Sequence, residues 1–137
     1  MPRKGVLNLT QKKNMLLKDL YKIVSLDNTN EQKHLAVVLI NEKHEVFKGH
    51  FPGNPIMPGV CMMQIIKELT EQITQSSLMM QTLTNAKFMA LINPEVTPEL
   101  RLELDITITD DNLVKVKNVT FFNETIALKL SSVYKKI

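Results

Sequence analysis

The sequence predicts an α+β fold in which an antiparallel sheet wraps around one long central helix, and three observations lead to this prediction. The chain has 137 residues, which suits a single domain spanning residues 1–137. One segment carries apolar residues at helical spacing, whereas the segments on either side of it alternate or are rich in β-branched residues. A lone apolar helix in so short a chain is covered only if the sheet curls around it.

Two β-rich runs come first. Tyr21 and Ile23 mark one run, and residues 34–40 form the other. The sequence Asp27-Asn28-Thr29-Asn30 between them is typical of a turn, so a hairpin is expected. Residues 3–14 are polar and are expected to form a loose or helical lead-in.

The central helix is expected to run from about Gly59 to about Ser76. Its apolar stripe recurs at spacings of four and three and consists of Met62, Ile66, Leu69 and Ile73, widened by Ile65. Four strands are expected to follow, at residues 86–92, 100–109, 113–122 and 125–134. Turn residues separate the last three at 110–112 and 123–124. Such a sheet leaves an exposed edge, and pairing of two edges in a dimer would protect it.

Composition excludes several classes of function. The net charge of +3 and the scarcity of Arg, found only at Arg3 and Arg101, argue against a duplex nucleic-acid binder. A single cysteine, Cys61, excludes an intrachain disulfide framework and a multi-cysteine zinc site. No apolar stretch is long enough to span a membrane, and residues 1–14 lack the apolar core of a secretory signal. We therefore expect a cytoplasmic location.

The segment 49–59 is the most informative for function, because it holds three of the four glycines and three of the six prolines. Such a stiff loop makes sense if one side chain must be held still, and His50 is the candidate. A histidine has an ordinary pKa near 6.5, so His50 is suited to act as a base at neutral pH. The alternative is a structural histidine bonded to a loop carbonyl. His34 and His44 lie in polar surroundings where solvated or packing roles are expected, and the spacing of the three indicates no metal site.

The dipeptide Pro58-Gly59 is expected to begin the helix. Proline is favoured in the first helical turn, where its missing N–H costs nothing. The N–H of Gly59 would then lie at the positive end of the helix, where it can polarise a carbonyl oxygen. A donor of this kind is typically worth about 3 kcal/mol to a developing oxyanion. The alternative is a helix start with no further role.

The string His50-Phe-Pro-Gly-Asn-Pro-Ile-Met-Pro-Gly-Val60 closely resembles the active-site signature of the 3-hydroxyacyl-acyl-carrier-protein dehydratases of bacterial fatty acid synthesis. These include the hydroxymyristoyl and hydroxydecanoyl types. A weaker likeness extends over most of the chain and includes Asn85-Ala-Lys-Phe88, but the Pro-His-Arg-Tyr-Pro segment common in the hydroxymyristoyl type has no counterpart. The resemblance implies a hotdog fold and a homodimer whose two active sites are each shared between subunits. It also implies dehydration of a 3-hydroxyacyl chain on acyl carrier protein, with no metal or redox cofactor.

The resemblance also assigns roles. His50 would act as the base at the substrate's α-carbon, and the N–H of Gly59 would hold the thioester carbonyl. The family carries Glu or Asp five residues after that glycine, where this chain has Gln64, and it usually carries Gln where this chain has Glu68. An amide cannot protonate a leaving hydroxyl, so we hypothesise that Glu68 supplies the carboxylate from the same helix face. The alternative is an exposed Glu68 on a solvated face.

Apolar residues around this segment are expected to line a tunnel for the acyl chain. The candidate substrate-binding residues are Phe51, Met57, Pro58, Val60, Met63 and Phe88, and Met62 and Met89 are further candidates for the wall. Cys61 is expected to be packed rather than nucleophilic, since the family has an apolar residue there. The lysines that would meet an acidic carrier protein are Lys12, Lys13, Lys48, Lys87, Lys135 and Lys136.

Gln64 keeps two other functions open. One is a non-catalytic hotdog subunit that binds acyl chains and pairs with an active partner. The other is a thioester hydrolase on the same fold, which would need a water-activating group near Gly59, with Glu68 as the nearby candidate.

Overall fold

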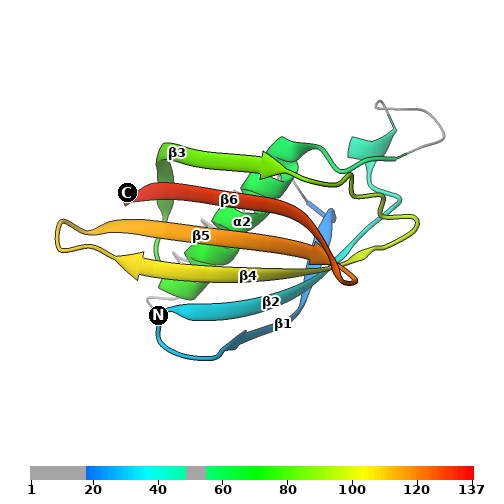
Figure 1. The fold of residues 1–137 in the computed structure, drawn as a ribbon. Helices are drawn as coiled ribbons and strands as arrows, with labels where there is room; N and C mark the ends of the chain where they lie inside the picture. The colour runs from blue at the N-terminus through cyan, green and yellow to red at the C-terminus, as the bar shows by residue number, and fades with distance from the viewer. Residues whose placement is uncertain (1–17, 49–54) are drawn as a thin grey trace, which may run out of the picture.

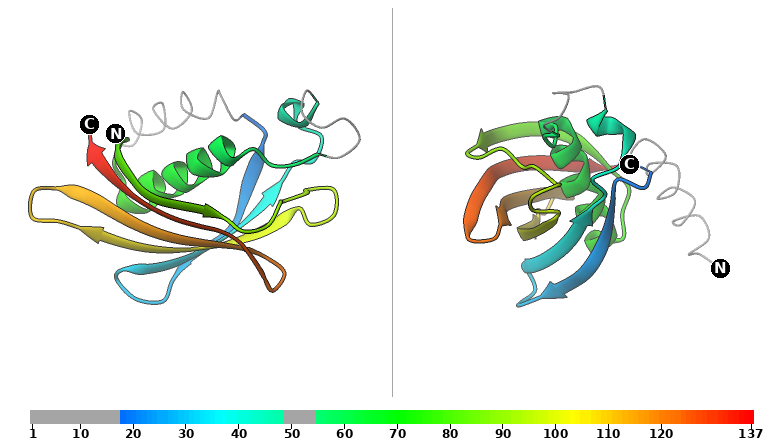
Figure 2. Two further views of the ribbon diagram at one scale, coloured as in Figure 1. Left: turned by 45° about the horizontal axis from the view of Figure 1, so that its top comes forward. Right: turned by 90° about the vertical axis from the view of Figure 1, so that its right-hand side faces the viewer.

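The computed structural model describes residues 18–48 and 55–137, which form one curved sheet with a long helix on its concave face (Figure 1; Figure 2). The elements in chain order are β1 (Tyr21–Asn28), β2 (Lys33–Ile40), the 3-10 helix η1 (Glu45–Phe47), α2 (Gly59–Thr74), β3 (Leu78–Phe88), β4 (Glu99–Ile108), β5 (Leu113–Phe122) and β6 (Thr125–Lys136). The strand order is β1-β2-β4-β5-β6-β3, and every neighbouring pair is antiparallel. The predicted α+β fold is confirmed.

The helix begins and ends for local reasons. Pro58 stands before its first residue in an extended conformation, and its carbonyl oxygen accepts from the amides of Cys61 and Met62 at 3.0 and 3.2 Å. At the other end Gln75 takes a left-handed conformation with φ 55°, and its amide donates to the carbonyl of Glu71. The observed start at Gly59 is the predicted one, and the helix ends two residues before the predicted end.

The core lies between α2 and the inner face of the sheet. The fully buried helical residues Ile65, Ile66 and Leu69 belong to the predicted apolar stripe and its flank. On β4 the alternation of leucines buries Leu100 and Leu102, as predicted. The hairpins around β5 also match the prediction, because Asn112 and Asn123 adopt left-handed conformations in the two turns.

The strand predicted at residues 86–92 is wrong in its bounds, since β3 covers Leu78–Phe88. The physical reason is its place at the edge of the sheet beside β6. Every residue from 81 to 88 is exposed, so the sequence has no alternation of apolar and polar residues there to mark a strand. The register also shifts twice along β3, between Met80 and Thr82 and between Leu83 and Asn85.

Candidate active site

The N-terminus of α2 carries the first backbone amides of the helix, which have no acceptor within the helix itself. Pro58 has no N–H, and among residues 18–48 and 55–137 no acceptor meets the amides of Gly59 and Val60. These amides lie at the positive end of a 16-residue helix. A carbonyl or anionic oxygen placed there would be stabilised, as expected from the sequence.

Gly59 also forms part of the wall of an apolar pocket of about 360 Å³. Its lining comes from three segments: Ile56, Met57, Pro58, Gly59 and Met62; Phe88, Ala90, Leu91 and Ile92; and Ala127 and Leu128. The amide of Met57 donates to the carbonyl of Ile92 at 2.8 Å, which ties the first segment to the second. The pocket can therefore take a hydrocarbon chain next to a backbone donor.

The structure brings some of the expected substrate-binding residues together and not others. Met57, Pro58 and Phe88 line the pocket with Gly59. Val60 points to solvent with 74% of its surface exposed, and Met63 is half-buried outside the pocket lining. His50 and Phe51 lie outside the described residues.

Gln64 and Glu68 form a polar cluster with Tyr21 of β1, separate from the apolar pocket. The Tyr21 hydroxyl donates to Oε1 of Glu68 at 2.6 Å, and Nε2 of Gln64 donates to Oε2 at 2.9 Å. Glu68 is only 7% exposed, so it does not lie on a solvated face. Burial raises the pKa of its carboxyl group, while the hydrogen bonds from Tyr21 and Gln64 act in the opposite direction.

Tyr21 was not singled out by sequence reasoning as a functional residue. Burial, followed by the nearby charge of Glu68, raises the pKa of its hydroxyl group, so Tyr21 stays protonated and acts as a donor at neutral pH. Its partner is 47 positions away, and no local pattern in the sequence marks such a pair.

The pocket at Gly59 and the polar cluster of Tyr21, Gln64 and Glu68 lie on different sides of α2. Glu68 follows Gly59 by nine residues, which on an α-helix is about 13 Å along the axis and about half a turn in direction. Gly59 faces Phe88 at the end of β3, whereas Glu68 faces Tyr21 of β1. Within one chain, the Glu68 carboxylate is therefore too far from the Gly59 amide to act on the same substrate atoms.

The other reactive side chains have ordinary structural roles. Cys61 is buried, and burial raises the pKa of its thiol, which disfavours a thiolate nucleophile. The ring of His44 begins η1, since Nδ1 accepts from the amide of Val46 and Nε2 lies 2.8 Å from the carbonyl of Lys18. His34 is half-buried on β2. In the described part of the chain, no group of three His, Cys, Asp or Glu residues is placed to hold a metal ion.

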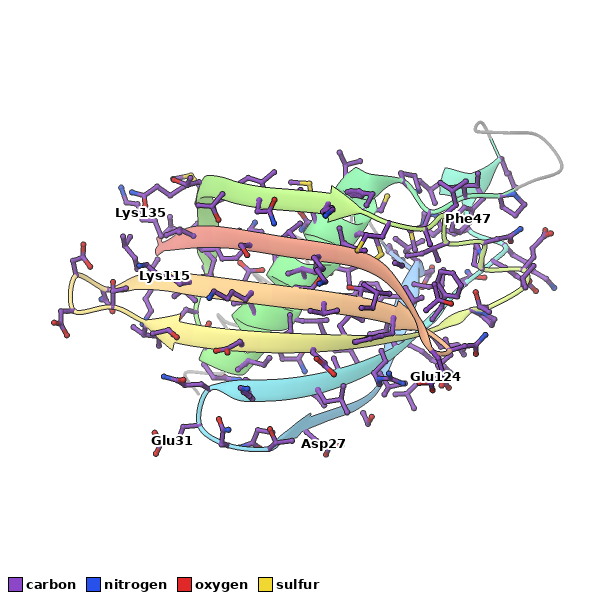
Figure 3. All side chains as sticks on the ribbon, in the orientation of Figure 1. Asp27, Glu31, Phe47, Lys115, Glu124 and Lys135 are labelled. Carbon is purple, nitrogen blue, oxygen red and sulfur yellow. The ribbon has the colours of Figure 1, made fainter. Side chains whose placement is uncertain are left out.

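Among the expected basic residues, Lys48 and Lys87 are exposed, and Lys12 and Lys13 lie outside the described residues. Lys135 is exposed on β6, close to Lys115 of β5 at the same end of the sheet (Figure 3). No helix in the described residues is long and apolar enough to cross a membrane.

Residues 26–122 match the sequence family ApeI-like, described as ApeI dehydratase. This chain belongs to that family. It is also similar to the 3-hydroxyacyl-[acyl-carrier-protein] dehydratase FabZ of Caulobacter sp. (strain K31), with 30% identity over 102 residues, 68% of this chain and 60% of the relative. FabZ of Lactobacillus helveticus is 34% identical over 87 residues, 58% of this chain and 56% of the relative. The ApeI-like chain thus spans about 60% of the length of these relatives.

Solved structures agree on the fold. The dehydratase heterocomplex ApeI:P from Xenorhabdus doucetiae superposes with a TM-score of 0.66 at 14% identity, covering 83% of this chain and 96% of that one. A hypothetical thioesterase with coenzyme A from Streptococcus pneumoniae gives 0.67 at 6% identity, covering 96% of each chain. These structures confirm the expected hotdog fold, and the family match over residues 26–122 confirms the expected dehydratase family.

Proposed function

We propose that this ApeI-like chain dehydrates a 3-hydroxyacyl group carried on acyl carrier protein, giving a trans-2-enoyl group and water. The observation that carries the proposal is that Gly59 lines an apolar pocket, nine residues after His50, and that its amide meets no acceptor among residues 18–48 and 55–137. The pocket suits the acyl chain, and the amide suits the thioester oxygen at its head. The similarity to FabZ supports the choice of substrate class.

The reaction needs three groups. His50 removes the proton from the α-carbon, and the electrons move into the thioester carbonyl, whose oxygen is stabilised by the N–H of Gly59. The enolate electrons then return to form the double bond between the α- and β-carbons as the carbon–oxygen bond at the β-carbon breaks, and the hydroxyl group takes up a proton and leaves as water. General acid–base help of this kind contributes typically about 10²–10⁴-fold to the rate.

We assign the group that protonates the hydroxyl to a second chain, because Glu68 lies on the other side of α2 from its own Gly59. Glu68 of an identical partner is the candidate for this role, which requires its carboxyl group to exchange the contacts with Tyr21 and Gln64, now made by both of its oxygens, for one with the substrate. Its burial raises the pKa of the carboxyl group, which favours the protonated form that a general acid needs.

The edge strand β3 offers a surface for a second chain, at the edge of the sheet opposite to β1 and Tyr21. Residues 78–86 contain no charged residue, whereas the opposite edge strand, β1, carries Lys22 and Asp27. Apolar side chains on or just after β3 are exposed, namely Met79, Leu83, Phe88 and Met89. An uncharged strand with exposed apolar side chains is the kind of edge that pairs with another chain.

A second candidate function is a subunit that completes its site only with a different protein. Gln64 at the usual acidic position favours it, because an amide donates no proton to a hydroxyl group. The solved relative ApeI:P is itself a dehydratase heterocomplex. In that arrangement the different chain, rather than an identical copy, would bring the carboxylate.

A product analysis tests the proposal. The purified chain is incubated with 3-hydroxyacyl-acyl-carrier-protein, and both the enoyl product and the free acid are followed by mass spectrometry. We expect enoyl product from the wild type, a loss of about 10²-fold or more in His50→Ala, and no change in the control His34→Ala.

Each of the other functions gives a different result. Free acid without enoyl product would indicate a thioester hydrolase. Neither product from the chain alone, with enoyl product once a different hotdog subunit is added, would favour the second candidate.

A further inference from the structure

Phe88 stands at the rim of the apolar pocket. It is the last residue of β3, its ring lines the pocket, and 51% of its surface is exposed. A side chain that lines a pocket and is also exposed in the single chain lies at the edge of that pocket. The ring therefore lies at the edge of the pocket beside β3.

The tip of this ring lies directly against Gly59. A Cβ built on Gly59 would be 2.8 Å from Cζ of Phe88 and 3.0 and 3.1 Å from its two Cε atoms. A side chain at position 59 would therefore have to displace the ring, whereas glycine allows this approach. The ring and the Gly59 amide consequently occupy one small region at the start of α2.

An acyl chain whose carbonyl oxygen binds the Gly59 amide must pass beside this ring. The carbons that follow the carbonyl carbon are then the ones that meet the ring first. Met62 and Leu128, which also line the pocket, are nearly fully buried, so this part of the wall has little room to adjust.

We propose that Phe88 is a specificity-determining residue that admits unbranched acyl chains and rejects chains branched close to the thioester. This inference rests on the proposed function, because it concerns the chain whose carbonyl Gly59 would hold. A branch would widen the acyl chain at the point where the Phe88 ring and the start of α2 leave the least space. One methyl group in a fitted apolar pocket commonly changes selectivity by about 10- to 200-fold.

The test compares binding of octanoyl-pantetheine and 4-methyloctanoyl-pantetheine to the whole chain by isothermal titration calorimetry. We expect the wild type to prefer the unbranched compound by about tenfold or more, and Phe88→Ala to lose most of this preference. Phe88→Leu should give an intermediate ratio. Ile108→Ala is the matched control, because Ile108 has the same 51% exposure but lies at the end of β4 and does not line the pocket.

The outcomes separate this inference from the proposed function. An unchanged binding ratio in both Phe88→Ala and Phe88→Leu, with circular dichroism showing folded protein, would overturn the role of Phe88. The same variants are then assayed with 3-hydroxyoctanoyl- and 3-hydroxy-4-methyloctanoyl-pantetheine. A shift in binding without enoyl product from any variant would support the role of Phe88 and contradict the dehydratase proposal alone.

Discussion

At the scale of single residues, the buried carboxyl group of Glu68 is the most informative feature. Tyr21 and Gln64 donate to its two oxygens, and only 7% of the residue is exposed. Burial raises its pKa from the ordinary value of 4.5, so the folded state favours the protonated form more than the unfolded state does. Stability from this group is then present below about pH 4.5 and is lost as pH rises through the folded-state pKa.

Glu68→Gln removes this dependence. The free energy of unfolding of the wild type should fall, relative to that of Glu68→Gln, as pH rises above 4.5. Urea unfolding between pH 4.5 and 8 measures the difference. The control Glu103→Gln lies on an exposed position of β4 and should run parallel to the wild type. A wild type that gains stability over Glu68→Gln with rising pH would show that the hydrogen bonds outweigh burial.

Sequence reasoning reached some of these residues for physical reasons. Gly59 is marked locally, because a proline before a glycine is a recognisable helix start. The Gln64–Glu68 contact follows from i, i+4 spacing on a helix. Tyr21 could not be found, since its partner is brought close only by the curl of β1 around α2.

At the scale of elements, the edge strand β3 makes the clearest prediction. Leu83→Lys places a charge on an uncharged edge and should weaken self-association by about tenfold or more, because like charges would meet in the paired edges. Sedimentation equilibrium over a range of protein concentrations measures the change. The mean mass should move toward that of a monomer.

Val24→Lys is the matched control for this experiment. Val24 is exposed on β1, at the opposite edge of the sheet, so its substitution should leave association unchanged. Equal weakening by both variants would point to a general effect of charge and would contradict pairing through β3.

The elements differ in how well the sequence marks them. The strands β4 and β5 alternate between a buried and an exposed face, and their bounds are predicted to within one residue. β3 lacks this signal, because its exposed residues leave neither face with a regular apolar pattern. The exposed side chains that leave β3 without a regular sequence pattern are thus also the ones that make it a candidate interface.

At the scale of the whole molecule, the sequence predicts the architecture better than it predicts the site. One apolar helix and a set of alternating strands leave few ways to cover the core, so the wrapped sheet follows from packing. The proposed site depends on which side of α2 each residue faces and, under our proposal, on a neighbouring chain. Helical spacing predicts that Gln64 lies beside Glu68, but it does not predict whether the two would act on substrate at the Gly59 of their own chain or of a partner.

A subunit-mixing experiment tests most directly whether the site is shared between chains. His50→Ala and Glu68→Gln are each expected to lose most of the dehydration activity. When the two variants are unfolded, mixed and refolded together, half of the sites in each mixed dimer carry both native residues, so activity should return to about a quarter of that of the wild type. If the mixture stays as inactive as its parents although mixed dimers form, or if Glu68→Gln alone keeps full activity, Glu68 is not the acid that crosses the interface.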